Sequence, residues 1–258
     1  MLTGPSASGK TTTAHKLAEE LVRQGMPARV VSLDNFFRGA EYYPRMPDGT
    51  TDYENLETLD LPLVNQCIKE LCETGKTVLP IYDFVQEARS AETEPVDLMG
   101  GVCIVEGIHA FNPALTSLVP AKEVYRVYAG LREEYCEEGR RVINTQNIRL
   151  CRRMLRDAAT RGRSPAKTLS MWDRVLDGET RYIKGFKSSA DFLLDTSFTY
   201  ELGIIAQLLQ IVRRQFTLEG HNAELWDDTA RRFEHVQPLP LELLPEDSML
   251  REFYPPQA

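Results

Sequence analysis

Residues Gly4 to Thr11 read Gly-Pro-Ser-Ala-Ser-Gly-Lys-Thr, which is the G-x-x-x-x-G-K-[ST] pattern of a phosphate-binding loop. The glycines let the backbone curl so that successive N–H groups face phosphate oxygens. Lys10 can reach the β- and γ-phosphates of a nucleotide, and the Thr11 hydroxyl can ligate Mg²⁺. Residues 13–22 carry apolar side chains at helical spacing, so a helix is expected to begin at the loop and direct its N-terminal dipole at the anion. The alternative is a chance Gly-rich turn, and the four constrained positions and the following helix argue against it.

Only Met1, Leu2 and Thr3 precede the loop, which normally follows a buried parallel strand. Because strands usually run about five or six residues, we expect either a shortened first strand or a sequence that starts inside a longer chain. In the first case these residues form the stub of a central strand. The strands that end at Asp34 and Glu106, or their neighbours, are expected to flank it.

Two acidic residues follow apolar runs, at positions where parallel strands would end. Asp34 comes after residues 30–33, and Glu106 comes after residues 102–105. Ligands of such folds bind outside the carboxyl ends of the strands. Either acid alone is equally compatible with a helix cap or a solvated turn. Together, beside a phosphate-binding loop, they supply a Mg²⁺ partner and a group that can orient or deprotonate an attacking hydroxyl.

A third candidate element is basic, with eight arginines between residues 140 and 163. They are Arg140, Arg141, Arg149, Arg152, Arg153, Arg156, Arg161 and Arg163. Four of them, from Arg149 to Arg156, have the spacing of one helical face, and Asp157 is the acid that opposes them in this span. A solvated charged face is the alternative, but mutual repulsion favours an anionic partner. The planar guanidinium suits phosphate, so we predict a helical lid over a phosphate donor.

The composition excludes several classes of protein. The chain has 258 residues, 42% hydrophobic and 26% charged, with a net charge of −8, which argues against a general nucleic-acid or anionic-membrane binder. Its five cysteines form no CxxC pair and no metal-like cluster with the four histidines, so a reducing cytoplasmic location is expected. The most apolar run, residues 202–212, is interpreted as a core helix. His109 is interpreted as a packed or turn residue.

Extended and helical patterns alternate along the chain. Extended runs are predicted at residues 28–33, 77–82, 102–105, 123–128 and 192–194. Helices are predicted at residues 13–22, 61–74, 147–161, 166–183, 200–214 and 223–235. The alternation predicts an α/β fold of the P-loop NTPase type, with a mostly parallel sheet and helices on both faces. Residues 1–215 are expected to form this domain, with the lid at about 140–185, and residues 216–258 to form a helix and tail packed on it.

Motifs beyond the loop occur in the order that one family shows. They are Ser-Leu-Asp-Asn-Phe-Phe at 32–37, Asp-Tyr-Glu at 52–54, Tyr-Asp-Phe at 82–84 with Arg89, Glu-Gly-Ile-His-Ala at 106–110 and the Arg-rich run 149–163. Over residues 3–215 the sequence resembles the uridine kinase family of P-loop nucleoside kinases. Residues 244–253 are similar to the tail of a subfamily in which the kinase follows a module like part of threonyl-tRNA synthetase, and that module is absent from this sequence.

The resemblance implies transfer of the γ-phosphate of ATP or GTP to the 5′-hydroxyl of a ribonucleoside such as uridine or cytidine, with Mg²⁺. The implied catalytic residues are Asp34 as general base, Lys10, Arg153 and Arg163. The implied metal-associated residues are Thr11, Glu106 and Asp34. The implied ATP-binding residues are Gly4, Ser6, Ala7, Ser8, Gly9, Lys10, Thr11, Thr12, Arg156 and Arg161.

The resemblance also implies a nucleoside site. Its residues are Tyr53, Glu54, Tyr82, Phe84, Arg89, Arg153 and Arg163. Glu54 is expected to accept hydrogen bonds from ribose hydroxyls, because a carboxylate is only an acceptor. The aromatic residues are expected to shape the pocket and stack on the base, with plain core packing as the alternative. The implied partner is this small molecule, with no nucleic acid and no membrane, and the oligomeric state stays open, a homo-oligomer included.

Three motifs depart from the family pattern, at four positions. Glu87 stands where many uridine kinases have a histidine that reads the pyrimidine, Asn147 replaces an acid, and Lys184-Gly185 replaces Phe-Pro. A carboxylate cannot donate to a carbonyl oxygen, so the preferred base stays open. Two alternatives remain: a P-loop kinase for another small molecule, such as a phosphorylated sugar or pantothenate, and a non-catalytic nucleotide-binding protein.

Overall fold

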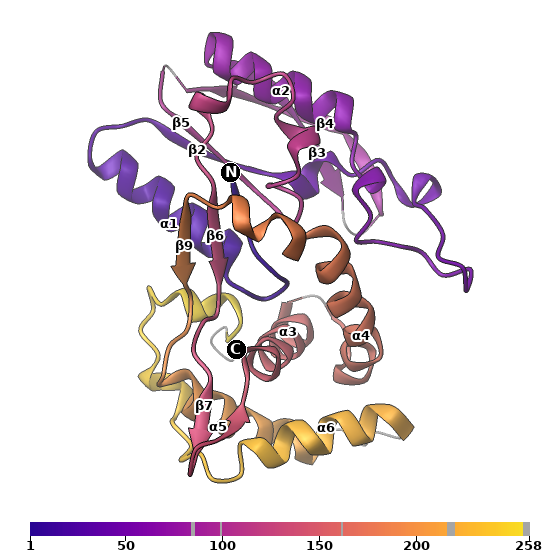
Figure 1. Cartoon of the computed structure of the whole chain (residues 1–258), viewed down its shortest axis with the longest axis vertical. Coiled ribbons are helices and arrows are strands. Elements are labelled where there is room, and N and C mark those ends of the chain that lie inside the picture. The colour runs from indigo at the N-terminus through magenta and orange to yellow at the C-terminus, as the bar shows by residue number, and fades with distance from the viewer. Residues whose placement is uncertain (84–85, 99, 161, 216–219, 255–258) are drawn as a thin grey trace. The chain divides into compact units, whose positions relative to one another are not determined.

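The structure is a computed structural model that describes residues 1–83, 86–98, 100–160, 162–215 and 220–254 (Figure 1). The chain forms two compact units, and each is described by itself. The first unit comprises Met1–Pro5, Lys10–Ala129 and Asp177–Leu194. The second unit comprises Ser6–Gly9, Gly130–Leu176 and Asp195–Ala258.

A five-stranded sheet is the framework of the first unit. Its strands, in the order β2-β5-β1-β6-β9, are β2 (Ala28–Ser32), β5 (Val102–Glu106), β1 (Leu2–Thr3), β6 (Val127–Gly130) and β9 (Phe192–Asp195). The pairs β2–β5, β5–β1 and β1–β6 are parallel. The predicted α/β fold with a mostly parallel sheet is confirmed.

The short strand β1 lies in the middle of this sheet. Leu2 is in register with Glu106 of β5 on one side and with Val127 of β6 on the other. The stub is therefore central, as predicted. Its neighbours are the strand that ends at Glu106 and β6, while β2, which leads to Asp34, lies beyond β5. The predicted extended run 123–128 is displaced, because residues 121–123 form a 3₁₀ turn and β6 begins at Val127.

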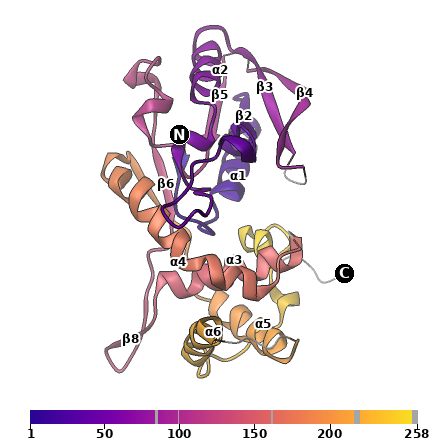
Figure 2. The same cartoon turned by 90° about the vertical axis from the view of Figure 1, so that its right-hand side faces the viewer.

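Two long helices accompany the sheet in the first unit (Figure 2). Helix α1 (Lys10–Arg23) begins inside the phosphate-loop motif and buries Ala14 and Ala18. Helix α2 (Leu61–Thr74) buries Val64, Cys67, Ile68 and Leu71, which have i, i+3, i+4, i+7 spacing. The Asp60 side chain caps its N-terminus, and Gly75 ends it at a φ of 72°, where a glycine is least costly. Full burial of each such apolar side chain is worth about 1.5–3 kcal/mol.

A separate antiparallel hairpin follows α2. It consists of β3 (Lys76–Asp83) and β4 (Ala88–Asp97), with Lys76 in register with Asp97. Strand β3 agrees with the extended run predicted at 77–82. Strand β4 was not predicted, because most of its residues are polar or charged and exposed, so the hydrophobic signal of a strand is weak.

The second unit is mostly helical. Its elements are β7 (Tyr135–Glu137), β8 (Arg140–Ile143), α3 (Thr145–Thr160), most of α4 (Pro165–Tyr182), α5 (Glu201–Gln215) and α6 (Gly220–Arg232). Its core takes side chains from α3, α4, α5 and α6 and from Phe253 and Tyr254 near the end of the chain. The last six residues of α4 belong to the first unit.

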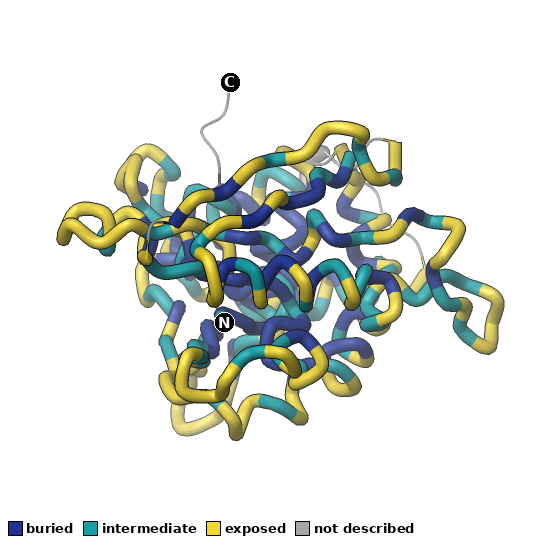
Figure 3. Tube along the Cα trace, turned by 90° about the horizontal axis from the view of Figure 1, so that it is seen from above, coloured by how far each residue is buried: buried dark blue, intermediate teal, exposed yellow. Residues whose placement is uncertain are grey.

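Short 3₁₀ helices connect these elements. They are η1 (Leu33–Phe36), η2 (Ala40–Tyr42), η3 (Leu56–Thr58), η4 (Pro113–Leu115), η5 (Ala121–Glu123), η6 (Lys184–Ser189), η7 (Leu241–Leu243) and η8 (Met249–Glu252). Buried and exposed residues alternate along the trace, as amphipathic elements require (Figure 3). In the described part of the chain, no helix combines the length and the apolar character needed to cross a bilayer.

Candidate active site

The phosphate-loop residues connect β1 to α1. Thr3, the last residue of β1, is fully buried, and its Oγ1 lies 2.9 Å from the carbonyl oxygen of Gly107 and 2.8 Å from that of Ile108. Lys10 Nζ donates a hydrogen bond of 3.2 Å to the carbonyl oxygen of Pro5. The lysine side chain therefore folds back over the start of its own loop.

Glu106 is a buried carboxylate of the first unit, at the end of β5. Its Oε2 accepts from the Thr11 hydroxyl at 3.3 Å, and its Oε1 accepts from the Ser32 hydroxyl at 2.8 Å. Burial raises the pKa of Glu106, and the charge of Asp34 acts in the same direction, whereas Lys10 and the two hydroxyls lower it. A cation bound beside this group would favour its ionised form. The hydroxyl and the carboxylate are hard oxygen ligands of the kind that Mg²⁺ takes.

Asp34 lies just after β2, in the short helix η1. The Ser32 hydroxyl accepts the Asp34 backbone N–H at 3.4 Å, so one serine touches both the Asp34 backbone and the Glu106 carboxylate. The Asp34 side chain is exposed, in contrast to the buried Glu106. The negative charges of Asp34 and Glu106 influence each other, but the two acids differ in exposure. The exposed Asp34 can meet a substrate, whereas the buried Glu106 can ligate a cation. Sequence reasoning missed this contact of Ser32, although its position two residues before Asp34 in the 32–37 motif was a signal for it.

The residues predicted for the acceptor side have varied surroundings within the first unit. Tyr53 is 49% exposed and packs edge-on against Tyr43, with ring centroids 5.7 Å apart. Tyr82 is buried, and its hydroxyl lies 3.0 Å from that of Tyr43. Arg89 Nη1 pairs with Asp60 Oδ2 at 3.1 Å, so this arginine braces the start of α2. Phe84 lies outside the described residues.

A polar cluster that sequence reasoning missed joins the end of α4 to the loop around Glu54. The Tyr182 hydroxyl donates to Asp52 Oδ2 at 2.9 Å and accepts from Asn55 Nδ2 at 3.2 Å. The side chain of Glu54 fills the space where a Cβ on Gly178 would lie. The signal in the sequence was the Asp-Tyr-Glu motif itself, whose first acid, Asp52, binds Tyr182.

His109 belongs to this cluster. It is 3% exposed, and its ring packs edge-on against Tyr182 with centroids 5.8 Å apart. Burial lowers the pKa of His109 from 6.5 to about 4, and a Glu54 backbone contact and the charge of Asp52 only partly oppose this. The imidazole is therefore neutral at neutral pH, which agrees with the predicted packed histidine.

This histidine makes the stability of the chain depend on pH. Because its pKa is lower in the folded than in the unfolded chain, the unfolded chain binds the extra proton, and stability falls as the pH drops from about 6.5 towards 4. Between pH 7 and pH 5 we expect the free energy of unfolding to fall by about 2 kcal/mol more in the unaltered protein than in His109→Leu. Urea unfolding of both proteins at the two pH values measures this difference. Equal pH dependence would contradict it.

In the second unit, loop residues lie against arginines of α3. Arg153 Nη1 donates to Ser6 Oγ at 2.6 Å, and Arg153 Nε lies 3.6 Å from Asp157 Oδ2. Arg156 Nη2 pairs with the same Asp157 at 3.3 Å. The Arg163 backbone N–H donates to the Asp157 carbonyl oxygen at 3.1 Å. Asp157 therefore contacts Arg156, which was predicted for the donor phosphates, and also Arg153 and Arg163, which were predicted for the reacting end, while Arg161 lies outside the described residues.

The other two arginines of α3 differ from the expectation. Arg149 and Arg152 are 4% and 0% exposed. Arg149 lies over the Trp172 ring at 5.6 Å, and Arg152 forms a buried ion pair with Glu201 at 2.6 Å. The four arginines therefore do not form one solvent-facing basic surface, because Arg149 and Arg152 are buried. Glu201 of α5, which is distant in sequence, neutralises Arg152.

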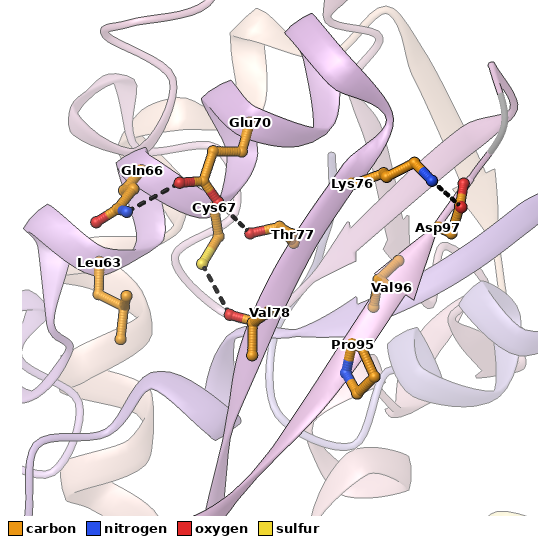
Figure 4. Close-up of a pocket in the computed structure, with 10 residues that line it drawn as sticks. All are labelled: Leu63, Gln66, Cys67, Glu70, Lys76, Thr77, Val78, Pro95, Val96 and Asp97. Carbon is orange, nitrogen blue, oxygen red and sulfur yellow. Dashed lines mark hydrogen bonds and ion pairs between the residues drawn. The ribbon is translucent and has the colours of Figure 1, made fainter.

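A cavity of about 720 Å³ lies elsewhere in the first unit, between α2 and the β3–β4 hairpin (Figure 4). Cys67 contacts the carbonyl oxygen of Val78 on one side, and Lys76 pairs with Asp97 at the rim, at 2.6 Å. The residues predicted for catalysis, metal, donor or acceptor do not line it. This cavity is therefore distinct from the candidate active site.

Comparison with known proteins shows which families the chain resembles. Residues 1–114 match the model of the phosphoribulokinase/uridine kinase family. A uridine kinase of Lactobacillus helveticus is 29% identical over 198 residues, which cover 75% of this chain and 83% of that protein. The predicted resemblance to the uridine kinase family is confirmed. A uridine kinase of Saccharomyces cerevisiae is 28% identical over 196 residues, but the match spans only 35% of that longer protein.

Solved structures agree on the fold. The phosphoribulokinase of Rhodobacter spheroides superposes with a TM-score of 0.51 at 19% identity, over 77% of this chain and 72% of that one. A kinase assigned to a fructose transport system of Silicibacter sp. TM1040 has a TM-score of 0.55 at 20% identity, over 75% and 87%. At these identities the similarity shows the kinase fold alone. The curated relatives support a kinase phosphotransferase, and such kinases imply ATP and usually Mg²⁺.

Proposed function

We propose that the chain is a nucleoside kinase that transfers the γ-phosphate of ATP, or of GTP, to the 5′-hydroxyl of a ribonucleoside, with a uridine- or cytidine-like acceptor. The observation that carries the proposal is the arrangement around Glu106. A buried carboxylate, bonded to the Thr11 hydroxyl and to Ser32, stands at the end of β5 beside the phosphate loop. The exposed Asp34 is coupled to it through charge. The uridine kinase relatives support the nucleoside as acceptor.

In this proposal Asp34 is the general base. It accepts the proton of the acceptor hydroxyl as that oxygen attacks the γ-phosphorus in line. The bond from the γ-phosphorus to the β,γ-bridging oxygen then breaks, and ADP or GDP leaves with that electron pair. Most of the catalysis in such a transfer comes from positioning and from stabilising charge.

The donor phosphates are proposed to lie on the phosphate loop, from Gly4 to Thr12. Lys10 and the arginines stabilise charge on the transferred group: Arg156 and Arg161 on the donor phosphates, and Arg153 and Arg163 towards the reacting end. Thr11 and Glu106 supply oxygen ligands for Mg²⁺, and the negative charge of Asp34 acts on Glu106. When Mg²⁺ is bound, it would neutralise phosphate charge.

The acceptor is proposed to meet residues of the first unit. Glu54 accepts from the ribose hydroxyls, and Tyr53, Tyr82 and Phe84 form the walls around the base. Tyr53 supports this role best, since its ring is half exposed while that of Tyr82 is buried. Arg89 supports the site through its ion pair with Asp60. We further propose a kinase domain over residues 1–215, with a C-terminal helix and tail at 216–258, and a cytoplasmic location.

The test is an acceptor panel. ADP release is measured with ATP or GTP as donor and with ribonucleosides, deoxyribonucleosides, phosphorylated sugars and pantothenate as acceptors. We expect turnover with a pyrimidine ribonucleoside at least about ten-fold above that with the matching 2′-deoxyribonucleoside, because Glu54 would lose a hydroxyl partner. Turnover of a phosphorylated sugar or pantothenate with no response to any nucleoside would refute the nucleoside proposal.

One observation favours the second candidate, a P-loop kinase for another small molecule. Glu87 adopts a φ of 50° at the turn before β4 and brings a carboxylate where many uridine kinases have a base-reading histidine. A negative group there cannot donate to a pyrimidine carbonyl oxygen. In the same panel, this candidate predicts a response from a non-nucleoside acceptor. Binding of ATP without turnover of any acceptor would instead indicate a non-catalytic nucleotide-binding protein.

A further inference from the structure

The last described segment of the chain, residues 248–254, lies inside the core of the second unit. It forms the short helix η8 and ends in an aromatic pair. Leu250, Phe253 and Tyr254 are each at most 1% exposed. A tail that merely covered the surface would not bury three such side chains. Its contacts therefore indicate a role within this unit.

The tail completes a buried network around Arg152. The guanidinium of Arg152 makes a bidentate pair with Glu201, with Nε–Oε1 and Nη2–Oε2 distances of 2.6 Å. The Tyr254 hydroxyl donates to Glu201 Oε1 at 2.6 Å. The Phe253 ring lies 4.9 Å from the guanidinium of Arg152. Burial and the neighbouring carboxylate raise the pKa of Tyr254, so its hydroxyl stays a donor at neutral pH.

The same network reaches the phosphate loop. Arg152 Nη1 donates to the carbonyl oxygen of Ala7 at 3.4 Å, while Nη2 donates to the Thr196 carbonyl oxygen at 2.8 Å. Ala7 has a φ of 58°, an uncommon conformation for a residue with a side chain. Such a conformation persists only when surrounding contacts hold it. Arg152 supplies one of these contacts.

A second contact is made by the tail itself. Gly9 has a φ of 84°, and a Cβ at this position would collide with the Cε of Met249 in η8. The terminal methyl of Met249 therefore packs directly on the loop backbone. One turn further along η8, Glu252 Oε1 lies 3.4 Å from Arg156 Nη1. The segment thus touches the loop, and also an arginine that is proposed to bind the donor phosphates.

We propose that residues 248–254 are a positioning element that holds the phosphate loop in its nucleotide-binding conformation, through Tyr254, Glu201 and Arg152 to Ala7, and through Met249 to Gly9. The inference rests on the proposed function only in that the loop binds a nucleotide. It does not depend on the acceptor. Loosening the network lets Ala7 relax to a negative φ, which turns its neighbouring backbone N–H groups away from the phosphate oxygens.

The test compares two tyrosine hydroxyl deletions in the full chain. Tyr254→Phe removes the buried donor to Glu201. Tyr135→Phe is the matched control, since its hydroxyl donates to Glu133 Oε2 at 2.8 Å in the same unit, whereas that of Tyr254 donates to Glu201. MgATP affinity is measured by calorimetry, the thermal midpoint is measured without nucleotide, and hydrogen exchange is followed in a peptide that covers residues 6–9.

For Tyr254→Phe we expect MgATP to bind about five-fold more weakly and the loop peptide to exchange faster. For Tyr135→Phe we expect both values within two-fold of the unaltered protein. A lower thermal midpoint in Tyr254→Phe with unchanged MgATP affinity and loop exchange would overturn the proposal, because it would show a purely structural role. If Tyr254→Phe does not fold, Phe253→Leu replaces it, with the same expected and contradicting results.

The same measurements separate this inference from the proposed kinase activity. An unaltered chain that binds MgATP but phosphorylates no nucleoside would refute the nucleoside kinase. The comparison of the two variants would still decide the role of the tail. An unaltered chain that binds no nucleotide would overturn both.

Discussion

Replacing Asp34 with asparagine is expected to lower kcat for phosphoryl transfer by about 100-fold to 10,000-fold, which is the usual contribution of a general base. Asparagine has nearly the same shape but cannot take the proton of an attacking hydroxyl. The side chain is exposed, and the backbone N–H of residue 34 keeps its bond to Ser32, so the fold should not change. Initial rates with a responsive nucleoside, together with the MgATP dissociation constant, measure the effect.

The control for this variant is Glu57→Gln, which neutralises another exposed acid of the same unit with no predicted role. We expect Glu57→Gln to keep its turnover, and Asp34→Asn to keep its MgATP affinity within about two-fold. Unaltered kcat in Asp34→Asn would remove Asp34 from the role of base. A large loss of MgATP affinity would instead assign Asp34 to the donor side.

Replacing Lys10 with alanine is expected to lower kcat/KM for MgATP by about 1,000-fold, since one preorganised charge on the transferred group is commonly worth about 100-fold to 1,000-fold. The physical reason is the loss of a cation that folds over the loop and contacts the Pro5 carbonyl oxygen. A second effect adds to it. Lys10 lowers the pKa of Glu106, so without it the buried carboxyl holds its proton more tightly and binds Mg²⁺ less well.

Lys16→Ala is the matched control, because Lys16 is exposed on the same helix α1 and lies outside the phosphate-loop motif. We expect its MgATP affinity and turnover to stay within two-fold of the unaltered protein. Transfer rates of Lys10→Ala close to those of Lys16→Ala would contradict the assigned role of the loop. A higher Mg²⁺ requirement in Lys10→Ala, measured by titration of the rate with MgCl₂, would separate the effect on Glu106 from the direct loss of charge.

The order of the elements was readable from the residues. The loop motif, the helix that follows it, and the apolar runs that end near Asp34 and Glu106 are local signals, and the structure forms α1, β2 and β5 there. Parallel pairing of β2 with β5 brings Ser32 into register with Glu106, so two residues far apart in the chain meet at one edge. The general rule that parallel strands end together made this meeting predictable.

Other features were not readable, for identifiable reasons. Strand β4 has a polar, exposed sequence, so only its pairing with β3 makes it a strand. The expected basic face of α3 rested on the scarcity of acids nearby in sequence. Glu201 and Glu252 come from α5 and from the tail, and no local pattern indicates that they neutralise Arg152 and Arg156. The low pKa of His109 likewise depends on its burial, and its ring packs against Tyr182 at the end of α4, which is distant in sequence.

By itself the sequence determined the phosphate loop, the α/β architecture and the identity of the two acids, because each depends on residue type and on spacing within a short segment. Tertiary structure alone decided that Arg152 is buried in an ion pair with Glu201 and that the Tyr254 hydroxyl is bonded to the same carboxylate. The physical reason is that a charged side chain loses its hydrating water only when the folded chain packs around it. A buried guanidinium needs a carboxylate at hydrogen-bond distance, and that carboxylate can come from any segment that the fold places beside it. For Arg152 it is Glu201 of α5.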